Sequence, residues 1–67
     1  MIRTNGHKIR LAREIKGLTL MQLAEQVGMS APYLSDIERG NRRGSRKTLE
    51  RIAAALGLKM EEIREVA

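Results

Sequence analysis

The stretch SDIERGNRRGSR, residues 35–46, gathers the side chains with the clearest chemical potential in the chain. Its basic members are Arg39, Arg42, Arg43 and Arg46, and its acidic members are Asp36 and Glu38. Guanidinium groups suit the binding of phosphate oxygens, because each presents several N–H donors in a planar fork. The segment is therefore either the edge of a surface for a polyanion or an ordinary solvated charge run.

The charge distribution along the whole chain favours the first interpretation. The 67 residues include 13 Lys and Arg against 8 Asp and Glu, for a net charge of +5. Basic residues dominate 39–51, whereas the acidic Glu61, Glu62 and Glu65 fall within 59–67. A basic patch of this kind is typical of proteins that bind nucleic acid or an anionic membrane.

Composition limits the other possibilities. A chain of this length holds one domain, residues 1–67, with one modest core. There is no cysteine, which excludes disulfides and thiolate metal sites and favours a reducing compartment. No segment resembles a signal peptide or supplies the roughly 20 apolar residues of a membrane span. We therefore expect a soluble, cytoplasmic protein without membrane contact.

Apolar spacing and glycine punctuation predict an all-α fold of five helices and no strand. The predicted helices cover about residues 5–16, 19–28, 30–39, 45–56 and 59–67. Thr19, Ser30 and Ser45 are the expected N-caps of the second, third and fourth helices. The expected core residues are Ile9, Ala12, Ile15, Leu20, Leu23, Ala24, Val27, Leu34, Ile37, Leu49, Ile52, Ala53, Leu56, Met60 and Ile63.

The second and third helices carry the strongest motif. Between them lies VGMS, in which Gly28 is able to adopt the left-handed conformation of a tight turn. Ala24 is small enough for the next helix to approach closely, and Leu34 and Ile37 give that helix a buried face. Together these positions predict a helix-turn-helix over about 19–39.

Longer motifs strengthen this prediction. The segment GLTLMQLAEQVGMSAPYLSDIERGNR, followed by TLERIAAALGL, resembles the phage-repressor and Cro-type helix-turn-helix domains, the xenobiotic-response-element-like family of bacterial and phage regulators. The resemblance covers residue 6 to about 63. It implies a five-helix domain that binds operator DNA through its third helix, usually as a two-fold dimer. The implied function is a sequence-specific transcriptional regulator, most simply a repressor.

The resemblance also implies roles for individual residues. Bases would be read in the major groove by Ala31, Pro32, Tyr33, Ser35 and Asp36. Phosphates would be contacted by Thr19, Arg39, Arg42, Arg43 and Arg46. Arg13 and Glu38 match an arginine and a glutamate that form a partly buried ion pair in several such repressors.

Three positions depart from the family pattern. Leu20 replaces a glutamine that contacts a phosphate in many members, Ala31 replaces a common base-reading glutamine, and Gly44 stands where proline is common. Asp36 is unusual on a DNA-facing surface. It would accept a hydrogen bond from a cytosine amino group or orient Arg39 or Arg43; the alternative is an idle surface acid.

Other classes of function fit less well. The single His7, the absence of cysteine and the absence of a phosphate-binding glycine loop argue against an enzyme, and no metal or cofactor is expected. The main alternative is an antitoxin-like or other protein-interaction module that keeps the fold. A homodimer is expected through the last helix, whose apolar side chains exceed what so small a domain would bury: Leu58, Met60, Ile63 and Val66.

Overall fold

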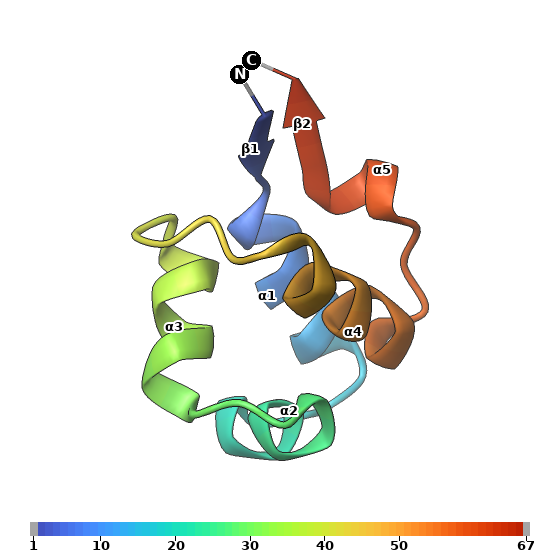
Figure 1. Cartoon of the computed structure of the whole chain (residues 1–67). Helices are drawn as coiled ribbons and strands as arrows, with labels where there is room; N and C mark the ends of the chain where they lie inside the picture. Colours follow the sequence, from blue (N-terminus) through green and yellow to red (C-terminus); the bar gives the residue numbers. More distant parts are fainter. Residues whose placement is uncertain (1, 67) are drawn as a thin grey trace.

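A computed structural model describes residues 2–66 as a helical domain closed by a short antiparallel ribbon. Figure 1 shows α2 and α3 on one side of the molecule and the two strands on another. The elements in chain order are β1 Ile2–Thr4, α1 Gly6–Ile15, α2 Leu20–Val27, α3 Ala31–Arg39, α4 Arg46–Leu56, α5 Met60–Ile63 and β2 Arg64–Val66. The predicted all-α architecture is thus confirmed for the five helices.

The ribbon corrects the prediction for the two ends of the chain. β1 pairs with β2 in antiparallel register, with Thr4 opposite Arg64, and no strand was predicted. The predicted helix over 59–67 is right only for α5, because Arg64 already has extended backbone angles. The last predicted residue, Ala67, lies outside the described residues. Strand pairing between opposite ends of a sequence leaves no local periodic signal, which is why the sequence pattern did not reveal it.

Polar side chains begin the helices where the sequence places them. Thr19, Ser30 and Ser45 each accept a hydrogen bond from the backbone N–H three residues later. At the other ends of α2 and α3, Gly28 and Gly40 have φ of 71° and 83°, a left-handed conformation that glycine adopts without steric cost. These caps fix the lengths of the two helices and the turn between them.

The core lies between α1, α2, α3 and α4 and is closed by α5. Its buried members are Ile9, Leu23, Ala24, Val27, Leu34, Ile37, Leu49, Ile52, Ala53, Leu56 and Ile63. Ile15, predicted to be part of it, is 78% exposed, because α1 ends there and the chain turns toward α2. No helix within residues 2–66 has the length and apolar content that a membrane span requires.

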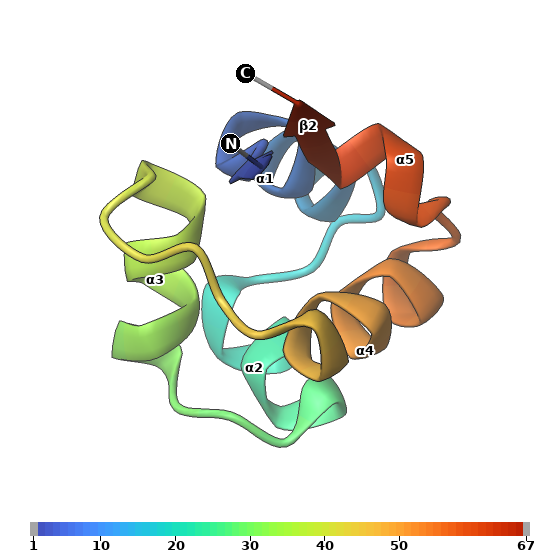
Figure 2. The ribbon, with the colours of Figure 1, turned by 45° about the horizontal axis from the view of Figure 1, so that its top comes forward.

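Gly6 allows α1 to dock on α3. It is buried, and a Cβ atom added there would lie 2.2 Å from the carbonyl oxygen of Ile37 and 2.5 Å from that of Glu38. Real Cβ atoms do not approach backbone oxygens so closely, so any larger residue would push the two helices apart. Figure 2 shows the start of α1 facing the upper end of α3, with the loop that follows α3 crossing toward α4.

We predict that Gly6→Ala lowers the free energy of unfolding by about 3 kcal/mol or more, since backbone atoms must move to admit the methyl group. Gly17→Ala is the matched control, because nothing lies within 4 Å of its added Cβ and only its φ of 73° opposes the change. That control should cost about 1 kcal/mol. Thermal melting of both variants is the measurement. Equal losses of stability would show that the contact between α1 and α3 admits a methyl group at Gly6.

Candidate nucleic-acid interface

α3 is held so that one side is buried and another is available to a ligand. Leu34 and Ile37 are fully buried, and they anchor the helix against α1, α2 and the core. The α2–turn–α3 unit brings this helix to the surface with its N-terminal end beside α2 (Figure 1). The predicted helix-turn-helix over 19–39 therefore exists as a packed unit.

The predicted base-reading residues share the accessible part of α3. Pro32 is exposed in the first turn, where its missing N–H leaves no helical hydrogen bond unmade. Ala31, Tyr33, Ser35 and Asp36 are partly exposed. None of the predicted set is in the buried core, and their polar atoms are within reach of a ligand.

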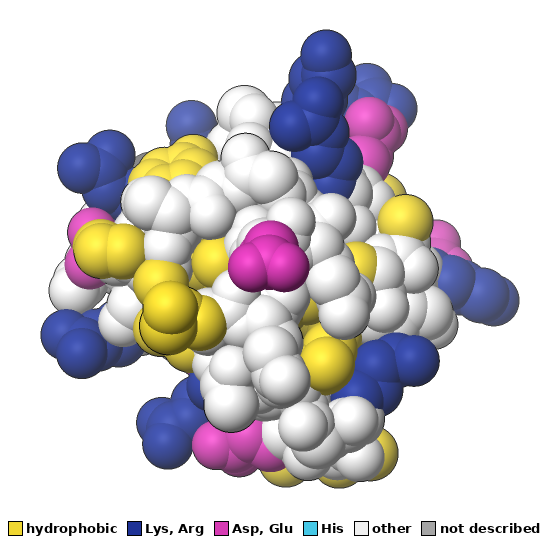
Figure 3. All heavy atoms as spheres, turned by 90° about the horizontal axis from the view of Figure 1, so that it is seen from below, with side chains coloured by type: hydrophobic (Ala, Val, Ile, Leu, Met, Phe, Trp, Pro, Cys, Tyr) yellow, Lys and Arg dark blue, Asp and Glu magenta, His cyan; other side chains and the backbone are white. Residues whose placement is uncertain are grey.

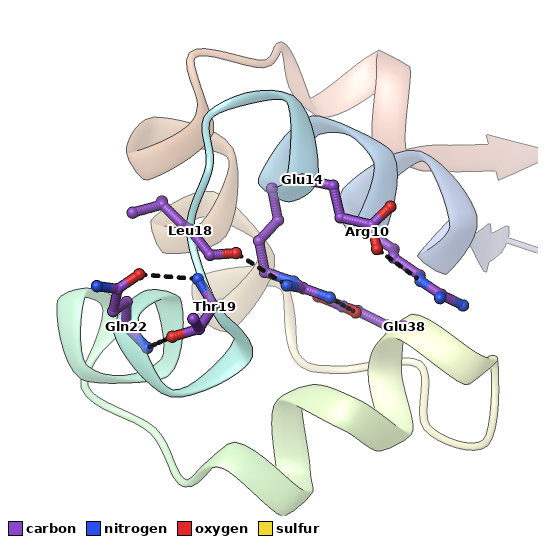
Figure 4. A network of polar contacts seen from close by, with 7 residues as sticks. Arg10, Glu14, Leu18, Thr19, Gln22 and Glu38 are labelled. Atoms are coloured by element: carbon purple, nitrogen blue, oxygen red, sulfur yellow. Dashed lines mark hydrogen bonds and ion pairs between the residues drawn. The ribbon is translucent and has the colours of Figure 1, made fainter.

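A partly buried ion pair fixes α3 relative to α1. Arg13 donates from Nε to Oε2 of Glu38 at 2.8 Å and from Nη2 to Oε1 at 3.0 Å, a bidentate arrangement. A further Arg13 nitrogen, Nη1, donates to the Leu18 carbonyl at 2.9 Å, so the guanidinium also holds the chain entering α2 (Figure 4). The Arg13 and Glu38 side chains are only 12% and 6% exposed. The structure thus contains the pair that the family resemblance implies, and one side chain ties α1 to α3 and to the segment that leads into α2.

This environment keeps Arg13 charged. Hydrogen bonding to Glu38 raises the pKa of Arg13 above its ordinary value, although burial acts in the opposite direction. A raised pKa means that the stabilising contribution is complete at lower pH and is lost only as the pH rises through the folded-state value. At neutral pH Arg13 is therefore fully charged.

The start of α2 is occupied by its own capping box. The Thr19 hydroxyl oxygen accepts from the backbone N–H of Gln22 at 3.1 Å, and the Gln22 side-chain oxygen accepts from the backbone N–H of Thr19 at 2.8 Å (Figure 4). The Thr19 N–H is thus engaged, whereas its hydroxyl is still able to donate. Leu20, at the next position, is half-buried and offers no polar group.

The basic loop after α3 is held at several points. The Thr4 hydroxyl donates to the Arg43 carbonyl oxygen, which joins the loop to the end of β1. Gly44 has φ of 78°, which proline cannot adopt, and a Cβ atom added there would lie 3.2 Å from Cδ1 of Ile37 and 3.3 Å from Cδ2 of Leu49. This geometry gives a physical reason for the departure from the family pattern at Gly44. Arg46, at the start of α4, pairs with Glu50 at 3.4 Å and is 77% exposed.

Asp36 has an arginine partner. Its Oδ2 accepts from Nε of Arg42 at 3.3 Å, and the Arg42 guanidinium lies 5.5 Å from the centre of the Tyr33 ring. The sequence had suggested Arg39 or Arg43 for this position and had assigned Arg42 to a phosphate. The structure therefore connects Arg42 to two of the predicted base-reading residues.

Sequence reasoning missed a second basic surface beside α3. A cleft of about 270 Å³ is lined by His7, Arg10, Arg13, Leu20, Ser35, Glu38 and Arg39. Within it, Arg10 pairs with Glu14 at 3.3 Å and both side chains are at least half exposed. The three-residue spacing of Arg10 and Arg13 along α1 was the available signal. It places both on one side of that helix.

The side where α2 lies carries most of its charge at the edges. Figure 3 shows Lys and Arg side chains, with some acidic ones, at the periphery of this face, and uncharged and hydrophobic surface around one acidic side chain in its middle. Neutral donors, acceptors and apolar groups suit base edges, whereas peripheral cations suit the phosphates that flank a groove. The arrangement fits a surface that meets a duplex.

We predict that Glu38→Ala lowers the free energy of unfolding by about 3 kcal/mol, because it leaves the buried Arg13 charge without its carboxylate. For a domain of this size the melting temperature should fall by more than about 10 °C. Glu14→Ala removes an exposed ion pair and should cost less than about 0.5 kcal/mol. Similar melting temperatures for the two variants would mean that the Arg13–Glu38 pair contributes little.

Known proteins resemble this chain over most of its length. The model of the helix-turn-helix domain family matches residues 6–66. The immunity repressor protein of Bacillus phage phi105 is 43% identical over 60 residues, or 90% of this chain and 42% of that protein. The chain therefore spans about two fifths of that relative's length.

Two solved structures share the fold. The restriction-modification controller protein C.AhdI from Aeromonas hydrophila gives a TM-score of 0.80 at 33% identity, covering 85% of this chain and 86% of that one. SinR, the master regulator for biofilm formation, in complex with DNA, gives a TM-score of 0.75 at 38% identity and covers 82% and 89%. With its capped α2–turn–α3 unit and these relatives, the chain belongs to the helix-turn-helix family of transcriptional regulators.

Proposed function

We propose that this chain is a sequence-specific double-stranded DNA-binding regulator that lays α3 in the major groove. The observation that carries the proposal is the rigid presentation of α3, with Leu34 and Ile37 buried, Glu38 fixed by Arg13, and the N-terminal face free for a ligand. The major groove is the groove wide enough for a helix, and its base edges form an unambiguous code. The similarity to SinR in complex with DNA supports the same conclusion.

Affinity would come mainly from the phosphates. Arg39, Arg43 and Arg46 lie at or beyond the C-terminal end of α3, where they would reach backbone oxygens on either side of the groove. The Thr19 hydroxyl at the start of α2 would supply a neutral donor. Such contacts release counterions, so binding should weaken steeply as salt rises.

Sequence selection would come from the exposed face of α3. Ala31 and Pro32 offer apolar contacts, for example to a thymine methyl group, while Ser35 both donates and accepts hydrogen bonds. Tyr33 and Asp36 are three residues apart and share one face of α3. Because these groups are few and mostly small, we expect each half-site to be defined at only a few base pairs.

We further propose that the chain represses transcription by occupying its operator, without catalysis or a cofactor, in the cytoplasm. The phage phi105 relative is an immunity repressor, which favours repression. A protein-interaction module that retains the fold is less favoured, because the DNA-facing surface keeps its basic rim. Binding to duplex DNA without a second protein from the cell would support the regulator. Purification in complex with a second protein would support the interaction module.

The proposed regulator acts as a two-fold homodimer, but the surface expected for dimerisation needs correction. Ile63 is fully buried in the core, so it is not available to a partner, and nothing is described of the Val66 side chain. The exposed large apolar side chains among the described residues are Leu11, Ile15 and Met21. Leu11 and Ile15 line a groove of about 260 Å³ together with Leu56 and Leu58, and we propose this groove as the dimer contact.

We predict that Arg43→Ala and Arg46→Ala each weaken binding to operator and random DNA alike, because a phosphate contact carries no sequence information. The slope of log affinity against log salt should fall by about one unit for each variant. Lys59→Ala is the control of equal charge, since Lys59 precedes α5, away from α3 (Figure 1). An unchanged salt slope for either variant would show that the arginine makes no phosphate contact and is only solvated.

We predict that two chains bind each operator, with their α3 helices about one DNA turn, roughly 34 Å, apart on a near-palindromic site. Analytical ultracentrifugation of the protein and of its DNA complex measures the number of chains. Ile15→Glu should weaken self-association while leaving the melting temperature near the wild-type value, since Ile15 is exposed. A single wild-type chain per operator would contradict the dimer.

A further inference from the structure

Arg42 differs from the other arginines beyond α3 in how closely its backbone is tied to the helix. The backbone N–H groups of Asn41 and Arg42 both donate to the Asp36 carbonyl oxygen, at 2.8 and 3.2 Å. Gly40, with φ of 83°, turns the chain back to allow this. The Cα of Arg42 is therefore a fixed extension of α3, although its sequence position is in the loop.

The side chain of Arg42 is oriented as well. Its Nε donates to Oδ2 of Asp36 at 3.3 Å, and its guanidinium carbon lies 5.5 Å from the Tyr33 ring centre, within cation–π range. Tyr33 and Asp36 are three residues apart and so share one face of α3. A carboxylate and an aromatic ring on that face thus hold one guanidinium beside the predicted base-reading residues.

The remaining hydrogen-bonding capacity of Arg42 points to its role. With Nε engaged by Asp36, the two terminal nitrogens retain their N–H groups, and the side chain is 60% exposed. Two parallel donors on a planar group match the O6 and N7 acceptors of guanine in the major groove. A phosphate contact would need only a positive charge, which the Asp36 carboxylate partly cancels.

We propose that Arg42 reads a guanine in the major groove and that Asp36 and Tyr33 are positioning residues for its guanidinium. The proposal rests on the DNA-binding function and gives Arg42 a different role from Arg43 and Arg46. It also accounts for an acidic residue on a DNA-facing surface. The repulsion between Asp36 and the phosphates is offset by the orientation that Asp36 imposes on Arg42.

The test begins with selection of bound duplexes from a random DNA pool, which defines the wild-type operator. Arg42→Lys keeps the charge but loses the planar pair of donors. It should lower operator affinity about tenfold or more while leaving random-DNA affinity and the salt slope unchanged. Repeated selection with this variant should lose the preference for one guanine in each half-site. Arg3→Lys is the matched control, since Arg3 is exposed in β1 outside the proposed interface, and it should keep the wild-type preference at every position.

A double-mutant cycle tests the positioning role. Asp36→Ala should weaken operator binding and leave random-DNA binding level or stronger, since a negative charge is removed. In the Arg42→Lys background the same change should cause no further loss of selectivity, because Asp36 acts through Arg42. An additional loss in that background would show that Asp36 reads a base itself and would overturn the positioning role.

Two substitutions test whether the Tyr33 ring helps to position Arg42. Tyr33→Phe keeps the ring face under Arg42 and should retain the guanine preference, whereas Tyr33→Leu should weaken it. Equal selectivity of the two variants would overturn the role of the ring. Melting temperatures close to that of wild type would show that each variant is folded.

The outcomes separate this inference from the proposed function. If the wild-type protein enriches no sequence, both are overturned. If it enriches an operator and Arg42→Lys still prefers the same guanine, the DNA-binding function stands and Arg42 is not its reader. A loss of affinity for random DNA equal to that for the operator would assign Arg42 to a phosphate.

Discussion

The docking of α3 on α1 is the constraint on which the proposed interface depends. It has two parts: the absence of a side chain at Gly6, which lets the helices meet backbone to backbone, and the bidentate pair between Arg13 and Glu38. The pair stands at the edge of the core and also fixes the Leu18 carbonyl before α2. A buried ion pair of this kind favours one orientation more reliably than it adds stability.

Because α3 is docked in this way, its residues and those of the loop after it occupy different positions on the surface. The N-terminal face of α3 presents small and neutral groups, and Gly40 turns the chain sharply at the end of the helix. Arg42 forms an ion pair with Asp36 of α3, whereas Arg46 is in the first turn of α4. In the proposed function, residues close in sequence would therefore reach different parts of a duplex, and different side chains would supply specificity and affinity.

Much of this was predictable from the sequence, because the signals are local. The caps at Thr19, Ser30 and Ser45 and the apolar spacing predicted five helices, of which the last was predicted too long, and family resemblance predicted the Arg13–Glu38 pair. The ribbon between β1 and β2 was not predictable, since its strands are short and come from opposite ends of the chain. Nor was the partner of Asp36, because it depends on how the loop folds back after Gly40. Ile15 has helical spacing but lies beyond the part of α1 that the core covers.

The central claim, that α3 and the loop after it form the DNA interface, is tested most directly by an NMR titration. Isotopically labelled protein would be mixed with its selected operator duplex, and amide shifts would be followed residue by residue. We expect the largest changes at 19–22 and 31–46, with little change across Ala54–Ile63. Changes concentrated in α4 and α5, with α3 unaffected, would contradict the account.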